Sequence, residues 1–201
     1  MAKWLRNEFD KCLTYEKLMD AHNLAKRGKG FRKEVILFEL KKEEYIKWLY
    51  EQLKYGKYEH GGYTAFYVTE PKLRKVEKSR YIDRLVHTWV VKKFLEPHFV
   101  PKFIEHSYAC LKNKGVHKSA IYIQNCMKQA KMKWGEYYIL KMDVSKYFAS
   151  INKEILVGIL KRTIKDEKVL WILKKIIYSG EKEVGIEIRK LYFSDVCQYL
   201  S

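Results

Sequence analysis

Apolar residues recur every three or four positions along several stretches of the chain, which is the spacing of one helix face. The pattern predicts helices over residues 41–55, over residues 83–97, where a proline stops the helix, and over residues 116–134. Two more are predicted to begin at Asn152 and Asp166, because these side chains suit helix N-caps. The clearest apolar stripe belongs to the third helix and comprises Val116, Ala120, Ile123, Met127, Ala130 and Trp134.

Three other stretches have the composition of strands. Residues 64–70 (TAFYVTE) and 72–82 (KLRKVEKSRYI) flank a proline, which predicts a β-hairpin. The run YYILKMDV at residues 137–144 predicts a third strand with an acidic residue near its C-terminal end. The expected fold is therefore α+β, helix-rich with a small antiparallel sheet.

The charge balance points to an anionic partner. Lys and Arg total 41 against 24 Asp and Glu, a net charge of +17. Such an excess attracts polyanions, of which nucleic acid is the commonest. The alternative is a basic, well-solvated surface without a dedicated ligand, and charge alone does not decide between them.

Cysteine usage and hydropathy narrow the protein class. The four cysteines show neither a CxxC pair nor zinc-ligand spacing, so we expect reduced thiols and no structural zinc. The first residues, MAKWLRNEFDKC, contain no apolar leader, and no stretch approaches the length of a membrane span. A soluble, cytoplasmic protein without a membrane partner is expected.

Asp143 is the most informative residue for chemistry. It follows an apolar run in LKMDVSKYFASI, residues 140–151. Burying a carboxylate there is costly unless a positive group meets it. In two-metal phosphoryl transfer, strand-borne aspartates hold a pair of Mg²⁺ ions, which supply that charge. The alternative is an aspartate that caps the turn after the strand.

Three blocks occur in order over most of the chain. They are YTAFYVTEPKLRKVEKSRYIDRLVHTWVVKKFLEPHF, then HSYACLKNKGVHKSA, then LKMDVSKYFASINKEIL. Together they resemble conserved blocks of the bacterial reverse transcriptases of group II introns, retrons and diversity-generating retroelements. The resemblance implies right-hand polymerase fingers plus a partial palm. It also implies an ancestral RNA-directed DNA polymerase reaction, with an RNA template, a DNA primer and deoxynucleoside triphosphates as partners.

The resemblance implies roles for residues of the third block. Asp143 matches the first catalytic aspartate and would bind Mg²⁺, with the backbone carbonyl of Val144 as a second metal ligand. Phe148 falls at the position of the gate that excludes ribonucleotides. Core packing behind the strand is the plain alternative for Phe148, and both roles are compatible.

Cations of the first two blocks are implied to contact the nucleic acid and nucleotide. Arg74, Arg80 and Arg84 match the block that reaches the incoming triphosphate and the template backbone, and guanidinium groups bind phosphate bidentately. Solvated salt bridges are the alternative for each. Lys112 and Lys114 lie near the family's template grip. There the match weakens, because Leu111 and Asn113 replace the usual Arg and Gly, and His117 is as readily a packed polar residue as a ligand.

The paired aspartates of the family's Y-x-D-D turn are missing; the nearest string, LYFSDV, has only Asp195. One carboxylate cannot hold two divalent ions, so we expect no polymerisation by this chain alone. In one permitted codon choice for residues 188–201, deleting a single A yields IGNYTSQMFANIY, which matches the family's next motif. We therefore expect that a one-base insertion near codon 189 truncated the enzyme, leaving an out-of-frame, poorly packed tail at residues 189–201.

The expected organisation has four parts. A helical N-terminal extension covers residues 1–60, fingers cover 61–136, a partial palm covers 137–188, and the off-family tail covers 189–201. The rival hypothesis is a non-catalytic module that binds nucleic acid or dimerises, since a small sheet with an unpaired edge invites association as a homodimer.

Overall fold

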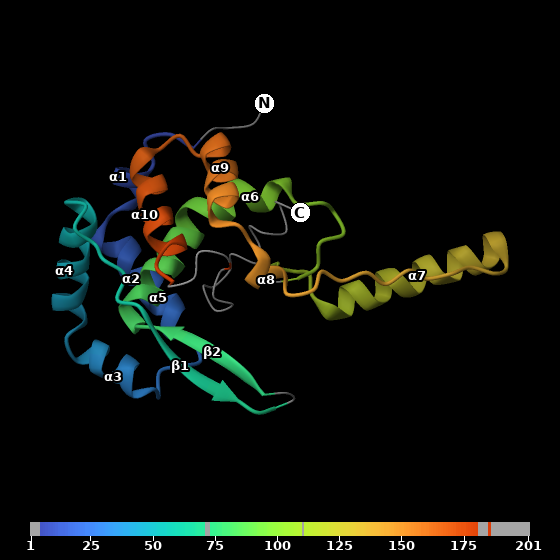
Figure 1. Cartoon of the computed structure of the whole chain (residues 1–201), viewed down its shortest axis with the longest axis horizontal. Coiled ribbons are helices and arrows are strands. Elements are labelled where there is room, and N and C mark those ends of the chain that lie inside the picture. Colours follow the sequence, from blue (N-terminus) through green and yellow to red (C-terminus); the bar gives the residue numbers. More distant parts are fainter. Residues whose placement is uncertain (1–4, 71–72, 110, 181–184, 186–201) are drawn as a thin grey trace.

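In the computed structural model, the described residues are 5–70, 73–109, 111–180 and 185. Among them helices predominate, beside one two-stranded antiparallel sheet (Figure 1), so the predicted helix-rich α+β character is confirmed. The predicted tail and Asp195 lie outside the described residues. The helices are α1 (Phe9–Cys12), α2 (Tyr15–Lys26), α3 (Lys33–Leu40), α4 (Lys42–Lys54), α5 (Tyr81–Val90), the π-helical turn η1 (Val91–Leu95), α6 (Glu96–Phe99), the 3-10 turn η2 (Val100–Lys102), α7 (Val116–Trp134), α8 (Tyr147–Ser150), α9 (Lys153–Thr163) and α10 (Glu167–Ile177).

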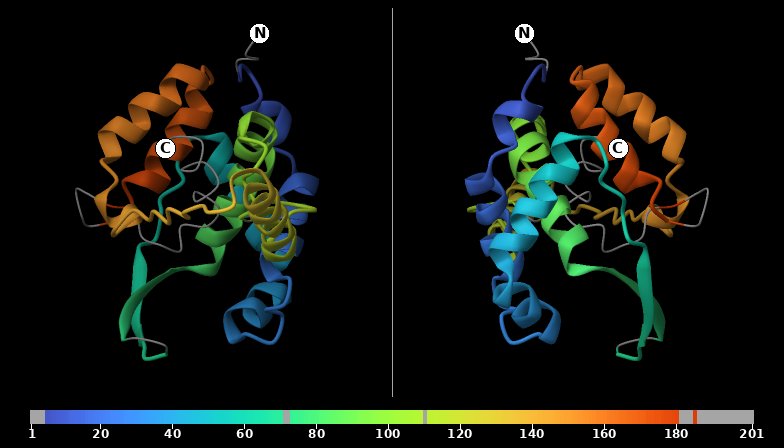
Figure 2. Two further views of the ribbon diagram at one scale, coloured as in Figure 1. Left: turned by 90° about the vertical axis from the view of Figure 1, so that its right-hand side faces the viewer. Right: turned by 90° about the vertical axis from the view of Figure 1, so that its left-hand side faces the viewer.

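The predicted hairpin is confirmed. Strand β1 (Tyr63–Val68) pairs antiparallel with β2 (Arg74–Ser79), from Tyr63 opposite Ser79 to Val68 opposite Arg74. A left-handed glycine, Gly56 at φ +67°, follows α4, as glycine permits at a helix end. The hairpin extends away from the helical body, and its second strand leads directly into α5 (Figure 2).

Helix α5 is the centre of the hydrophobic core. It packs against α2 and α3 on one side and α10 on the other, as Figure 2 shows. Its Trp89 is fully buried, with the ring of Phe9 at 5.5 Å and that of Phe94 at 5.1 Å, both edge-on. Edge-to-face pairs at these distances add to the gain from burial, so this aromatic cluster fixes α1 against α5.

The helix that begins with α5 passes the predicted stop at Pro97. It continues through η1 into α6, whose first turn contains the proline. The prediction was wrong because proline is tolerated in the first turn of a helix, where its missing N–H would have no partner. The π-helical turn before it shifts the hydrogen-bonding register at that point.

Asp166 joins the two ends of the described chain. Its Oδ1 accepts the backbone N–H groups of Lys168 and Val169, which confirms the predicted N-cap of α10. Its Oδ2 accepts those of Glu8 and Phe9 at 2.8 and 3.0 Å. The predicted cap of α9 is confirmed too, as Asn152 accepts two amides there. Helices α9 and α10 thus share one core with the N-terminal helices.

Helix α7 and residues 135–144 form an arm that projects from this body (Figure 1). The predicted helix is confirmed, yet none of its side chains is buried, and its apolar stripe faces solvent from Val116 (83% exposed) to Trp134 (66%). Residues 137–144 run back beside it as neither helix nor strand. The strand prediction was wrong because a strand needs a neighbour for its hydrogen bonds, and among the described residues β1 and β2 pair only with each other.

Candidate nucleic-acid interface

A buried carboxylate lies at the base of the hairpin. Asp83, in the first turn of α5, has no exposed surface and accepts hydrogen bonds from three directions. The Tyr58 hydroxyl donates to Oδ1 at 2.8 Å, the Gly61 amide donates to Oδ2 at 3.2 Å, and Arg80 Nε donates to Oδ2 at 3.1 Å. Burial and the hydrogen bond to the Asp83 carboxylate together raise the pKa of the Tyr58 hydroxyl, which therefore stays a donor. Asp83 therefore pairs with an arginine and holds it in place.

Arg80 is anchored at one nitrogen, and its side chain is more than half exposed. Its side chain is 55% exposed although its partner is fully buried. Asp83 binds Nε, and no hydrogen bond or ion pair between described residues involves the two terminal amino groups. The guanidinium crosses the backbone of Gly61 so closely that a Cβ there would collide with it. A glycine at this position therefore leaves room for the guanidinium of Arg80.

Arg84 is held differently, within a network that joins three elements. Its Nη2 donates to Glu34 of α3 at 2.5 Å, and its side chain is only 14% exposed. Lys78 of β2 binds the other oxygen of Glu34 at 2.9 Å. Although burial opposes ionisation of Glu34, the bonds from Lys78 and Arg84 hold the pKa of this carboxyl below its usual value. Arg84 therefore fastens α5 to α3, in keeping with the salt-bridge alternative.

The remaining cations predicted to bind nucleic acid lie on the hairpin and at the foot of the arm. Arg74 is the first residue of β2 and pairs with Val68 across the hairpin. Lys112 is exposed, whereas the Lys114 ammonium donates to the backbone oxygen of Glu105 and lies 5.6 Å from the Tyr108 ring centre. His117 is exposed, so it is not a packed polar residue.

The predicted metal-binding residues lie on the arm, and the predicted gate residue lies beyond it. Asp143 and Val144 are exposed in the segment that follows α7, and Phe148 lies half-buried on α8 with its ring edge-on to Tyr147 at 5.4 Å. No three His, Cys, Asp or Glu side chains among the described residues gather closely enough to hold a metal ion. The described residues therefore do not fit a pair of Mg²⁺ ions, because Asp143 has no second carboxylate beside it.

The structure brings Arg80 and Arg84 together at the start of α5, but no bond between described residues joins either to Asp143. Sequence reasoning missed a second buried network nearby. His22 Nε2 lies 2.8 Å from Glu39, and His22 Nδ1 lies 2.9 Å from the Tyr81 hydroxyl. No local motif marks these residues, because they come together only when α2, α3 and α5 pack.

Comparison with known proteins gives little further information. No family model matches the chain. An uncharacterized mitochondrial protein, ymf11, from Marchantia polymorpha is 27% identical over 89 residues, which is 44% of this chain but only 11% of that protein. This relative is itself uncharacterized, so the similarity brings no activity with it. Within the described part of the chain, no helix is both long and apolar enough to cross a bilayer.

Proposed function

We propose that this chain is the fingers and first palm portion of an RNA-directed DNA polymerase, and that it binds nucleic acid without polymerising by itself. The ordered sequence blocks support the ancestry, and one geometric observation carries the binding proposal. Arg80 is fixed at Nε by a buried aspartate while its side chain stays 55% exposed. An immobilised guanidinium binds phosphate oxygens at a lower cost in side-chain entropy than a free one.

The second support is the positive charge along the arm. The arm carries lysines at positions 118, 128, 131 and 133 of α7, and no acidic residue occurs within that helix. Lysines spread along an exposed helix neutralise phosphates of any sequence. We propose that Arg80 makes an oriented phosphate contact, while the lysines, Lys112 included, add salt-sensitive affinity.

Polymerisation itself needs groups that the described residues do not supply. The first catalytic aspartate of the family resemblance, Asp143, lies exposed and alone. A mixture of this chain, primer–template, deoxynucleoside triphosphates and Mg²⁺ is therefore expected to yield no extended primer.

The binding proposal is tested with a labelled RNA/DNA hybrid, by fluorescence anisotropy between about 50 and 200 mM salt. Arg80→Ala is expected to weaken binding about tenfold and to reduce the salt dependence by about one phosphate contact. Arg162→Ala, which removes an exposed arginine of α9, is the matched control. Equal losses in both variants would mean that Arg80 has no special role.

The second candidate function is a non-catalytic module that dimerises. The exposed apolar stripe of α7 favours it, because contiguous apolar surfaces of this kind mark interaction sites. Sedimentation of the free chain separates the two: a stable dimer whose hybrid affinity is unaffected by Arg80→Ala would support the module instead.

A further inference from the structure

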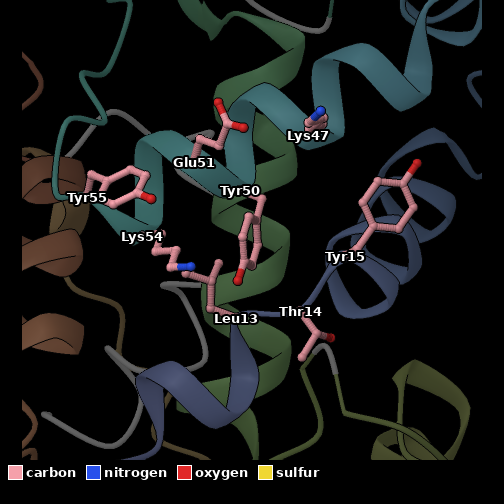
Figure 3. A pocket seen from close by; sticks show the side chains of 8 residues that line it. All are labelled: Leu13, Thr14, Tyr15, Lys47, Tyr50, Glu51, Lys54 and Tyr55. Carbon is pink, nitrogen blue, oxygen red and sulfur yellow. The ribbon is translucent and has the colours of Figure 1, made fainter.

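A hollow lined by tyrosines and lysines lies among the N-terminal helices, and its lining residues fall between positions 13 and 55. It is formed where the link between α1 and α2 meets one face of α4, and it has a volume of about 480 Å³. Its walls include Tyr15, Tyr50, Tyr55, Lys47 and Lys54 (Figure 3). The size falls within the range of about 300–1,000 Å³ typical of small-ligand sites.

The α4 wall of this hollow arises from helical spacing. Lys47, Tyr50 and Lys54 are three and four residues apart, so they share one face of α4, and Tyr55 follows at the helix end. Tyr50 is partly buried against the core, which fixes its ring. Tyr55 is 66% exposed and Tyr15 is 41% exposed, so both rings present area to a ligand.

A cation lies between two of the rings. The Lys54 ammonium is 5.6 Å from the centre of the Tyr50 ring and 5.8 Å from that of Tyr55. Figure 3 shows Tyr15 on the other side of Tyr50, and the Glu51 carboxylate pointing away from the Tyr50 ring. The wall therefore combines ring faces with a positive charge held among them.

We propose that this hollow binds an unpaired nucleotide of single-stranded nucleic acid, with the base stacked on the tyrosines and the phosphate at Lys54 and Lys47. Ring faces stack on any base, and adjacent cations follow the backbone, which is how sequence-independent single-strand sites are built. A base-paired strand is excluded, because its base faces are already stacked. The inference rests on the proposed function in one respect, since it takes nucleic acid to be the partner.

The test is anisotropy of the full chain with a labelled single strand of about 10 nucleotides, within the ~4–16 nucleotides that such sites cover. The double variant Tyr15→Ala/Tyr55→Ala is expected to weaken binding about tenfold, and Lys54→Gln severalfold with a smaller salt slope. Affinity for a blunt duplex is expected to stay unchanged. The matched controls are Trp48→Ala, an exposed aromatic of α4 outside the hollow, and Lys57→Gln. Unfolding of every variant is followed by circular dichroism to confirm that each is folded.

The outcomes separate the two proposals. This inference would be overturned if the two hollow variants, Tyr15→Ala/Tyr55→Ala and Lys54→Gln, bound the single strand as tightly as the wild type. It would also be overturned if the control variants lost as much affinity. Neither outcome would change the Arg80 result on hybrids. Loss in the hollow variants with no effect of Arg80→Ala on hybrids would keep the hollow and overturn the proposal that Arg80 makes the phosphate contact. Competition by a free nucleoside monophosphate as strong as that by the strand would show a mononucleotide site, which contradicts the strand proposal.

Discussion

Asp83 and Arg80 form an ion pair in which the carboxylate is fully buried and the guanidinium is more than half exposed, with 3.1 Å between Oδ2 and Nε. Because of this difference in exposure, the two residues have different roles. Asp83 organises the protein, since it also binds Tyr58 and Gly61, whereas Arg80 presents charge to solvent. Stability and ligand binding should therefore respond differently to the loss of each partner.

Asp83→Ala is expected to lower the free energy of unfolding by about 2–4 kcal/mol, because it leaves the buried Tyr58 hydroxyl without its acceptor. Arg80→Ala should cost less than about 1 kcal/mol, as expected for a solvent-screened cation. Urea denaturation of both variants measures the difference. Equal costs would show that the exposed arginine, rather than the buried hydrogen bonds, stabilises the hairpin base.

The Glu34 network predicts a pH dependence in the acid range. Since the folded-state pKa of Glu34 lies below its ordinary value of 4.5, its contribution is present above that pH and is lost as the pH falls through the folded-state pKa. The free energy of unfolding of the wild type should exceed that of Glu34→Gln by about 1–2 kcal/mol near pH 6. This difference should narrow towards pH 3. Glu43→Gln, at an exposed position of α4, is the control and should show no gap.

His22 predicts a second pH dependence, closer to neutrality. Burial lowers the pKa of His22 below 6.5 and outweighs the hydrogen bond that the ring donates to Glu39, which raises it. The neutral ring satisfies both neighbours, because Nε2–H donates to Glu39 and Nδ1 accepts the Tyr81 hydroxyl. As the pH falls below about 6.5, the unfolded chain gains a proton that the folded chain resists, so stability decreases.

Thermal unfolding between pH 7 and pH 5 tests this expectation. Wild type should lose stability over that interval, and His22→Gln should lose less, although it starts from a lower value. The interval stays above the range in which Glu39 titrates, because the pKa of that carboxyl lies below 4.5. Parallel pH profiles for the two proteins would contradict the assignment of a neutral buried histidine.

The sequence was enough to predict those features that depend on residues a few positions apart in the chain. The caps at Asn152 and Asp166 and the hairpin formed as predicted, because turns and N-caps are decided within a few positions. The sequence did not predict which arginine, Arg80 or Arg84, would be held in place and remain exposed. Arg84 is fastened by Glu34, 50 positions earlier in the chain, and no spacing rule links the two residues.

The strand predicted at residues 137–144 failed for a related reason. Its composition favours a strand, but a strand forms only against another strand, and in the described chain none lies beside it. Likewise, the apolar periodicity of α7 predicted the helix but not its partner. Periodicity shows which face is apolar, and packing decides whether that face is covered.

The exposure of the arm gives the last prediction. Because no side chain of α7 is buried, the double variant Ile123→Gln/Met127→Gln should change the free energy of unfolding by less than about 0.5 kcal/mol. Leu160→Ala, which opens the core under α9, should cost about 2–5 kcal/mol in the same urea titration. Chymotrypsin should cut first between Trp134 and Met142, where large apolar residues are exposed outside any helix or strand, and should leave the body resistant. A destabilisation by the double variant as large as that of Leu160→Ala, or protection of this segment, would show that the arm packs against the body in solution.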